Sequence, residues 1–157
     1  HVMLVDLARN DLGRVAQPGT IQVGPYRSVE RYSHVMHLVS GVQGRMEPHY
    51  DPFDLFAATF PAGTVVGAPK LKAAELIAKL EPQARGVYAG TVGYFGHNDA
   101  MDQAIAIRTL TFCQGRYTYQ AGAGIVADSV PEAEYRETCF KGRAMQQALQ
   151  FAMGGLV

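Results

Sequence analysis

Apolar residues recur at three- and four-residue intervals in four stretches of the chain, and this spacing predicts four helices. The first covers residues 1–12 and is expected to stop at Gly13. The second follows Asp51, which is expected to cap it, and the third covers residues 70–80. The fourth follows Ser129, which fits a capping box with the glutamate three residues later.

Runs of apolar and β-branched residues predict the strands. The longest covers residues 29–45, and both of its faces are largely apolar, so we expect it to be covered on both sides. A glycine-interrupted strand is expected at 86–96, and residues 102–124 are expected to form a hairpin that turns at Gln114-Gly115. Because these runs bracket helices without regular alternation, we predict an α+β fold with mainly antiparallel sheet.

Two acids and a lysine share one side of the fourth helix. Glu134 and Glu137 are three residues apart, and Lys141 follows four residues later. The same side continues into three alanines that form the stripe expected to face the core: Ala144, Ala148 and Ala152. Two inward carboxylates about 4 Å apart repel by about 4 kcal/mol at an effective dielectric near 20. Such a pair needs a proton, a lysine or a metal ion beside it.

Several other residues are candidates for contact with a ligand. Arg108 shares a strand face with small apolar residues, so it is either paired with an acid or aimed at an anionic ligand. Gly122 and Gly124 share one strand face and leave room for a ligand or another backbone. The glycine- and threonine-containing loop 61–69 is equally consistent with an anion site and a plain connection. The pattern around His37 is usual for a core histidine, and a catalytic role is the alternative.

Composition narrows the class of protein. The chain has 157 residues, 48% of them hydrophobic, which is typical of a globular protein with a sizeable core. A net charge of zero without a basic block argues against nucleic acid, and no apolar run approaches the roughly 20 residues of a membrane span. Cys113 and Cys139 fit no metal-binding spacing, so a reduced, cytoplasmic setting is expected. His1 stands inside a helical pattern without an initiator methionine, and we expect a piece of something longer.

Six segments, in order and nearly end to end, resemble the chorismate-utilising enzymes, and most closely their anthranilate synthase branch. They are VMLVDLARNDLGRV, VERYSHVMHLVSGVQG, FPAGTVVGAPKLKAAELI, YAGTVGYFG, MDQAIAIRTL and QAGAGIVADSVPEAEYRETCFK. The resemblance implies magnesium-dependent conversion of chorismate and ammonia to anthranilate and pyruvate in tryptophan biosynthesis. A glutamine amidotransferase partner would supply the ammonia. The implied fold packs two antiparallel sheets between helices, with residues 1–157 as the C-terminal portion of one chorismate-binding domain.

The resemblance also implies roles for individual residues. Glu137 matches a magnesium ligand, and Glu134 matches the acid that borders the metal. His37 matches a histidine implicated in the aromatising elimination of pyruvate, and Thr64, with Gly63, matches the loop that closes over the ring. The positions that match the surroundings of the two chorismate carboxylates are Tyr88, Arg108, Gly122, Gly124 and Lys141.

The chain departs from the family pattern at its start. A further magnesium-ligating glutamate is implied just before the residue that matches His1, together with an N-terminal half of the fold, and neither is in this sequence. We therefore expect no anthranilate synthase activity from this polypeptide alone. Three alternatives stay open: aminodeoxychorismate synthase, an isochorismate or phenazine type of enzyme, and a non-catalytic module whose charged residues form internal salt bridges.

Overall fold

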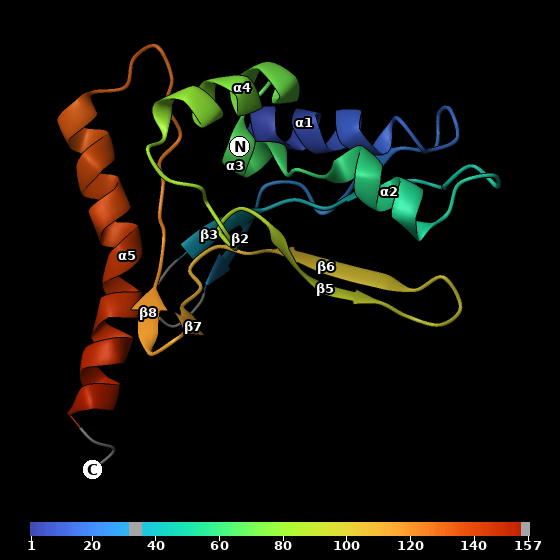
Figure 1. Ribbon diagram of the computed structural model, residues 1–157. Coiled ribbons are helices and arrows are strands. Elements are labelled where there is room, and N and C mark those ends of the chain that lie inside the picture. Colours follow the sequence, from blue (N-terminus) through green and yellow to red (C-terminus); the bar gives the residue numbers. More distant parts are fainter. Residues whose placement is uncertain (32–35, 155–157) are drawn as a thin grey trace.

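A computed structural model describes residues 1–31 and 36–154 of the chain (Figure 1). Its helices are α1 (Val2–Leu12), α2 (Pro52–Thr59), α3 (Gly63–Val66), α4 (Lys70–Leu80) and α5 (Pro131–Met153). Its strands are β1 (Gln22–Val23), β2 (Ser28–Arg31), β3 (Met36–Val39), β4 (Val42–Gln43), β5 (Thr91–Phe95), β6 (Met101–Ile105), β7 (Thr111–Cys113) and β8 (Arg116–Thr118). Among these residues the strands pair as β1–β4, β2–β3, β5–β6 and β7–β8, each pair antiparallel. The predicted α+β class with antiparallel pairing is confirmed.

The helices fall into two groups. Helix α1 contacts α2 and α3, and α3 contacts α4, so these four helices form one cluster above the strand pairs (Figure 1). Helix α5 stands at the other side of the molecule and runs past β7 and β8 (Figure 1). The segment between β8 and α5 passes close to the helix cluster and connects the two groups.

Apolar spacing and capping residues in the sequence predicted the positions of three helices correctly. Helices α1 and α4 begin within one residue of their predicted positions, and α2 starts after its predicted cap, Asp51. The Asp51 carboxylate accepts hydrogen bonds from the backbone N–H groups of Phe53 and Asp54, and the Asp54 carboxylate accepts one from the N–H of Asp51. The predicted loop 61–69 contains an extra turn of helix, α3, which the pattern did not indicate.

The predicted capping box of α5 is wrong. The residue at the N-cap is Val130, with φ −101° and ψ 117°, and it makes no side-chain cap hydrogen bond. The Ser129 hydroxyl oxygen instead accepts a hydrogen bond of 3.0 Å from the N–H of Val126. Pro131 explains the shift, because a proline disfavours helical backbone in the residue before it and so keeps Val130 extended.

The predicted inward face of α5 is also wrong. Ala144, Ala148 and Ala152 are exposed, and the buried residues of the helix are Gly142 and Met145. The cause is a close approach of Tyr119, since a Cβ on Gly142 would lie 2.8 Å from that ring. This contact turns α5 so that Thr138, Lys141 and Met145 face the rest of the molecule, with Glu134 half-buried on the same side and Glu137 at its edge.

The single long strand predicted at 29–45 is three strands. Strand β2 pairs with β3 so that Glu30 lies opposite His37, and β4 pairs with β1 instead. The part of this run at residues 32–35 lies outside the described residues. Exposed positions alternate with half-buried ones along β3, so the expectation of cover on both faces is not met within this chain.

The predicted hairpin at 102–124 is broken in its middle. Strand β6 ends at Ile105 and pairs with β5, and Arg108 has a left-handed φ of 51°. A shorter hairpin of β7 and β8 follows, with the expected turn at Gln114-Gly115, where φ is 50° and 76°. Residues 119–126 run on in extended form without a strand partner among the described residues. A left-handed residue ends a pleated ladder, which is why the pattern of alternation overstated the strand.

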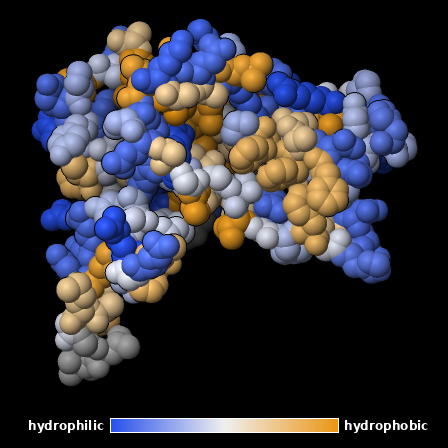
Figure 2. Space-filling model, in the orientation of Figure 1, coloured by the Kyte–Doolittle hydropathy of each residue, from blue (hydrophilic) through white to orange (hydrophobic). Residues whose placement is uncertain are grey.

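The core is small, which contradicts the expectation of a sizeable one. The accessible surface is 11886 Å², whereas a compact monomer of this mass exposes about 7,700 Å². The buried apolar residues are Val5, Val15, Ala58, Ala89, Ala106 and Met145. Figure 2 shows apolar side chains open to solvent over the helices and the strand pairs. Within the described residues, no helix is both long and apolar enough to cross a membrane.

Candidate chorismate site

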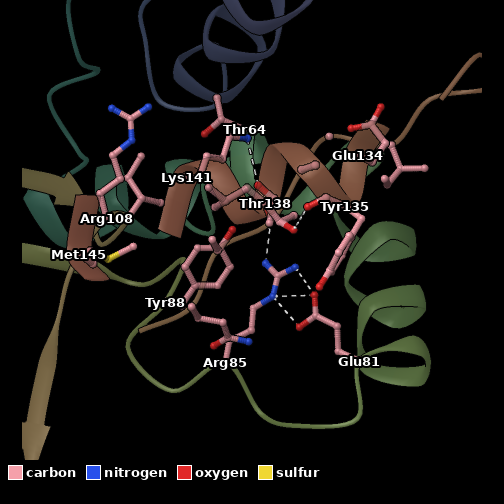
Figure 3. Close-up of a pocket in the computed structure, with 18 residues that line it drawn as sticks. Thr64, Glu81, Arg85, Tyr88, Arg108, Glu134, Tyr135, Thr138, Lys141 and Met145 are labelled. Carbon is pink, nitrogen blue, oxygen red and sulfur yellow. Dashed lines mark hydrogen bonds and ion pairs between the residues drawn. The ribbon is translucent and has the colours of Figure 1, made fainter. Parts of the chain in front are cut away.

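A cavity of about 540 Å³ lies between the end of α4, the extended segment before α5 and the inner side of α5 (Figure 3). Its wall is part apolar and part charged. Seven of the residues singled out from the sequence line it: Thr64, Tyr88, Arg108, Gly122, Gly124, Glu134 and Lys141. The structure therefore brings together residues that are up to 77 positions apart in the chain, from Thr64 to Lys141.

The two glycines of the extended segment have different surroundings. A Cβ on Gly122 would lie 2.8 Å from the hydroxyl oxygen of Tyr88, so the missing side chain allows that tyrosine to approach the backbone. A Cβ on Gly124 would have no heavy atom within 4 Å. The predicted open patch is therefore half occupied by Tyr88 and half open toward the cavity.

Lys141 connects α5 to this segment. Its ammonium Nζ lies 2.6 Å from Glu137 Oε1 and donates a hydrogen bond of 3.0 Å to the carbonyl oxygen of Gly122. The Lys141 side chain is 36% exposed and that of Glu137 51%, so solvent weakens their ion pair. The sequence predicted that the two acids need a proton, a lysine or a metal ion beside them. In the structure, Lys141 is the partner of Glu137.

The two acids of α5 form the acidic edge of the cavity. Glu134 lines it, and Glu137 lies one helical turn further along, beside the lining residue Lys141. Within residues 1–31 and 36–154, no cluster of three or more histidine, cysteine or acidic side chains is placed to hold a metal ion. Magnesium keeps several waters and commonly uses one or two protein carboxylates, so the oxygen donors of Glu134 and Glu137 fit it as a partial ligand set.

Arg108 is a cation in the cavity wall without a partner among residues 1–31 and 36–154. It is exposed, and among the described residues its guanidinium forms no hydrogen bond or ion pair. Figure 3 places it at one end of the cavity and Glu134 at the other. Of the two roles left open by the sequence, pairing with an acid finds no support here, and a ligand anion is the partner that the position suits.

The sequence reasoning missed an ion pair in the wall. Glu81 and Arg85 both line the cavity, and three hydrogen bonds of 2.6 to 3.1 Å join the guanidinium to the carboxylate. These hydrogen bonds hold the pKa of Glu81 below its usual value and raise that of Arg85. Both residues follow the end of α4 at Leu80, so the four-residue spacing of a helix does not apply to them, and no local sequence pattern indicated the pair.

Three predicted site residues are not among the described residues that line the cavity: His37, Gly63 and Glu137, the last of which lies beside Lys141. His37 lies on β3. Gly63 is buried next to Thr64, and a Cβ there would collide with the Leu7 side chain of α1. The absence of a side chain at Gly63 thus lets α3 pack on α1, which brings Thr64 to the cavity wall.

The sequence profile of a family described as "chorismate binding enzyme" matches residues 1–147. The chain belongs to this family. Anthranilate synthase component 1 of Aquifex aeolicus is 55% identical over 152 residues, which cover 97% of this chain and 31% of that protein. Aminodeoxychorismate synthase component 1 of Bacillus subtilis is 50% identical over 152 residues, which cover 97% of this chain and 32% of that protein.

Solved structures support the same fold. The crystal structure of anthranilate synthase component I from Streptococcus pneumoniae superposes with a TM-score of 0.87 at 50% identity. The match covers 92% of this chain and 33% of that one. The chain therefore spans about a third of the length of the relatives that it matches.

Proposed function

We propose that this chain is the C-terminal portion of a chorismate-binding domain, in a protein that converts chorismate and ammonia to anthranilate and pyruvate. The observation that carries the proposal is the cavity, in which Arg108 and Lys141 face the same space as Glu134. Chorismate carries two carboxylates, so a site with Arg108 at one end and a carboxylate that can ligate a metal at the other suits both of them. Relatives named anthranilate synthase component 1 support the choice of product.

Each lining residue has a proposed task. Arg108 and Tyr88 hold one carboxylate of chorismate, and the open backbone at Gly124 lets the ring approach the wall. Thr64, carried on α3, covers the ring from the opposite side. Lys141 holds the backbone at Gly122, which is part of the cavity wall, through its hydrogen bond to the Gly122 carbonyl oxygen.

We propose that Glu134 and Glu137 hold magnesium beside the second carboxylate. The bound ion would offset the negative charge of that carboxylate and orient it. In this structure the Glu137 carboxylate is paired with Lys141, so metal binding at Glu137 competes with that ion pair. We keep His37 in its proposed role in the aromatising elimination of pyruvate, although it does not line the cavity here.

The proposal extends to partners and setting. A glutamine amidotransferase would supply ammonia, as the resemblance implies, and the remainder of the same polypeptide would complete the site. Cys113 and Cys139 are both free thiols in the structure, and the proposed setting is the reduced cytoplasm.

Aminodeoxychorismate synthase is the second candidate, because the Bacillus subtilis protein of that name is 50% identical over nearly the whole chain. The two functions differ in whether the enolpyruvyl group leaves. They use the same substrate, so the cavity described here serves either one.

Product identification with the complete protein separates the candidates. Incubation with chorismate, magnesium and an ammonium salt is expected to yield fluorescent anthranilate and an equal amount of pyruvate. An aminated product that retains its enolpyruvyl group would assign the second candidate. Isothermal titration that detects neither chorismate nor magnesium binding would instead make the chain a non-catalytic module.

A further inference from the structure

One guanidinium in the cavity wall contacts groups from three parts of the chain. Arg85 donates three hydrogen bonds to the Glu81 carboxylate and, through Nη1, one of 2.8 Å to the carbonyl oxygen of Val65. Its Cζ also lies 5.3 Å from the centre of the Tyr88 ring. Figure 3 shows Arg85 between Glu81 and Tyr88 at the foot of the cavity. All four residues line that cavity.

The loop between α2 and α4, residues 60–69, is held at both its base and its tip. At the base, Lys70 Nζ donates a 2.8 Å hydrogen bond to the Thr59 carbonyl oxygen and forms a 2.8 Å ion pair with Asp11. At the tip, the hydrogen bond from Arg85 reaches Val65, the neighbour of Thr64. The loop that carries Thr64 is therefore held in one position.

The wall that Arg85 supports borders two cavities. Glu81, Arg85 and Tyr88 line a second cavity of about 530 Å³ as well as the first. Because these side chains border two cavities, the hydrogen bonds of Arg85 hold the wall where close packing is reduced. An arginine suits this task better than a lysine, because its planar fork donates in several directions from one rigid group.

We propose that Arg85, oriented by Glu81, is a positioning residue that sets both Thr64 and the Tyr88 ring against the substrate. The inference rests on the proposed function and adds to it residues that the resemblance did not mark. Arg85 need not contact chorismate for this role. Its effect passes through the Val65 carbonyl and the face of Tyr88.

The test uses the complete protein with Arg85→Lys and Glu81→Gln. Both changes are expected to lower kcat/KM for chorismate by roughly 10- to 100-fold, as supporting shells of a site do when lost. Most of the fall is expected in KM, because the wall contacts the ring already in the ground state. In a protein that already carries Tyr88→Leu, Arg85→Lys is expected to lower kcat/KM several-fold less than in the parent. The reason is that the Tyr88 ring, one of the two groups that Arg85 positions, is then absent.

Helix α4 offers a matched control. Lys72 and Glu75 form a 2.9 Å ion pair on α4 with side chains 64% and 58% exposed, and neither lines a cavity described here. Lys72→Met is expected to leave kcat/KM within about twofold of the parent, because exposed pairs contribute little.

The outcomes separate this inference from the proposed function. A parent protein that does not turn over chorismate would refute the function itself. A parent that does, with Arg85→Lys and Glu81→Gln no more impaired than Lys72→Met, would overturn the positioning role. Unfolding of both wall variants would also overturn it, because the pair would then be a structural lock.

Discussion

The two walls of the cavity are held by different kinds of contact. The wall formed by loop 60–69 and the end of α4 is fastened by the ion pairs Asp11–Lys70, whose side chains are both 11% exposed, and Glu81–Arg85, at 33% and 20%. The opposite wall, residues 119–126 and α5, is joined by Lys141, whose partner Glu137 has a side chain that is 51% exposed.

We call loop 60–69 with the end of α4 the preset wall, and residues 119–126 with α5 the adjustable wall. Removing one partner of a nearly buried pair such as Asp11–Lys70 leaves an uncompensated charge, so this contact keeps a single geometry. The more exposed Glu81–Arg85 pair is held by three hydrogen bonds. An exposed pair contributes about 0 to 1 kcal/mol and is readily exchanged for another ion. We therefore propose that the charges of substrate and metal are accommodated on the α5 side, where Lys141 and Glu137 can change partners at low cost.

The largest expected effect is on the adjustable wall. Glu137→Gln removes a carboxylate proposed to hold magnesium, and turnover in the complete protein is expected to fall by at least about 100-fold, because even outer-shell changes at metal sites cost 10- to 100-fold. Steady-state anthranilate production measures the loss, and calorimetry measures magnesium affinity. Glu132→Gln is the control, since Glu132 is exposed in the first turn of α5 and does not line the cavity. Magnesium binding and turnover that survive in Glu137→Gln would remove this residue from the metal site.

On the preset wall, Lys70→Met is expected to lower the free energy of unfolding by about 3 kcal/mol, because it leaves the Asp11 carboxylate buried and unpaired. Asp11 is 8% exposed, so water does not replace the lost ammonium. Urea unfolding followed by circular dichroism measures the change. The exposed counterpart Lys72→Met is expected to shift stability by no more than about 0.5 kcal/mol. Equal losses in the two variants would abolish the distinction between the walls.

The two glycines of the 119–126 segment provide a finer comparison. Gly122→Ala places a methyl group 2.8 Å from the Tyr88 hydroxyl, and this overpacking is expected to cost about 1 kcal/mol of stability. Gly124→Ala meets no atom within 4 Å and is expected to leave stability unchanged, while its methyl group obstructs chorismate and raises KM. Thermal unfolding and KM measured side by side test both. A destabilised Gly124→Ala would mean that the segment is less open than the structure shows.

The smallest effect is a pH dependence of the preset wall. Hydrogen bonds from Arg85 hold the pKa of Glu81 below its ordinary value of 4.5, so the unfolded chain binds this proton more readily than the folded one. The contribution of the pair to stability is therefore present above pH 4.5 and declines as the pH falls through the lower folded pKa. The stability difference between the parent and Glu81→Gln is expected to stay constant near neutral pH and to narrow in acid. A difference that widens in acid would contradict this sign.

Local chemistry made part of the site predictable. The capping box at Asp51 and the apolar stripe of α4 depend on residues within a few positions of each other, and both gave the correct helices. The spacing of Glu134, Glu137 and Lys141 placed them correctly on neighbouring turns of one helix, and the Glu137–Lys141 ion pair follows from that spacing. The strand pattern indicated Arg108, and the resemblance to the chorismate-utilising enzymes added Thr64 and Tyr88; all three line the cavity.

Contacts between distant segments decided the rest. The packing of Tyr119 on Gly142 chose which side of α5 faces inward, and a stripe of alanines has too little apolar area to oppose that choice. The left-handed turn at Arg108 cut short a strand that alternation alone extended. The hydrogen bond from Arg85 to Val65 joins residues 20 positions apart, so the local sequence pattern did not predict it.

The sequence by itself determined which residues become helix, which charges share a helix face, and which family's set of site residues the chain carries. These properties depend on backbone preferences and side-chain spacing over one or two turns. Only the tertiary structure decided the rotation of α5, the assembly of the cavity and the support of its wall by Glu81 and Arg85. Those features arise from the close approach of segments far apart in the chain, where single contacts of a ring, a glycine or a guanidinium outweigh local preference.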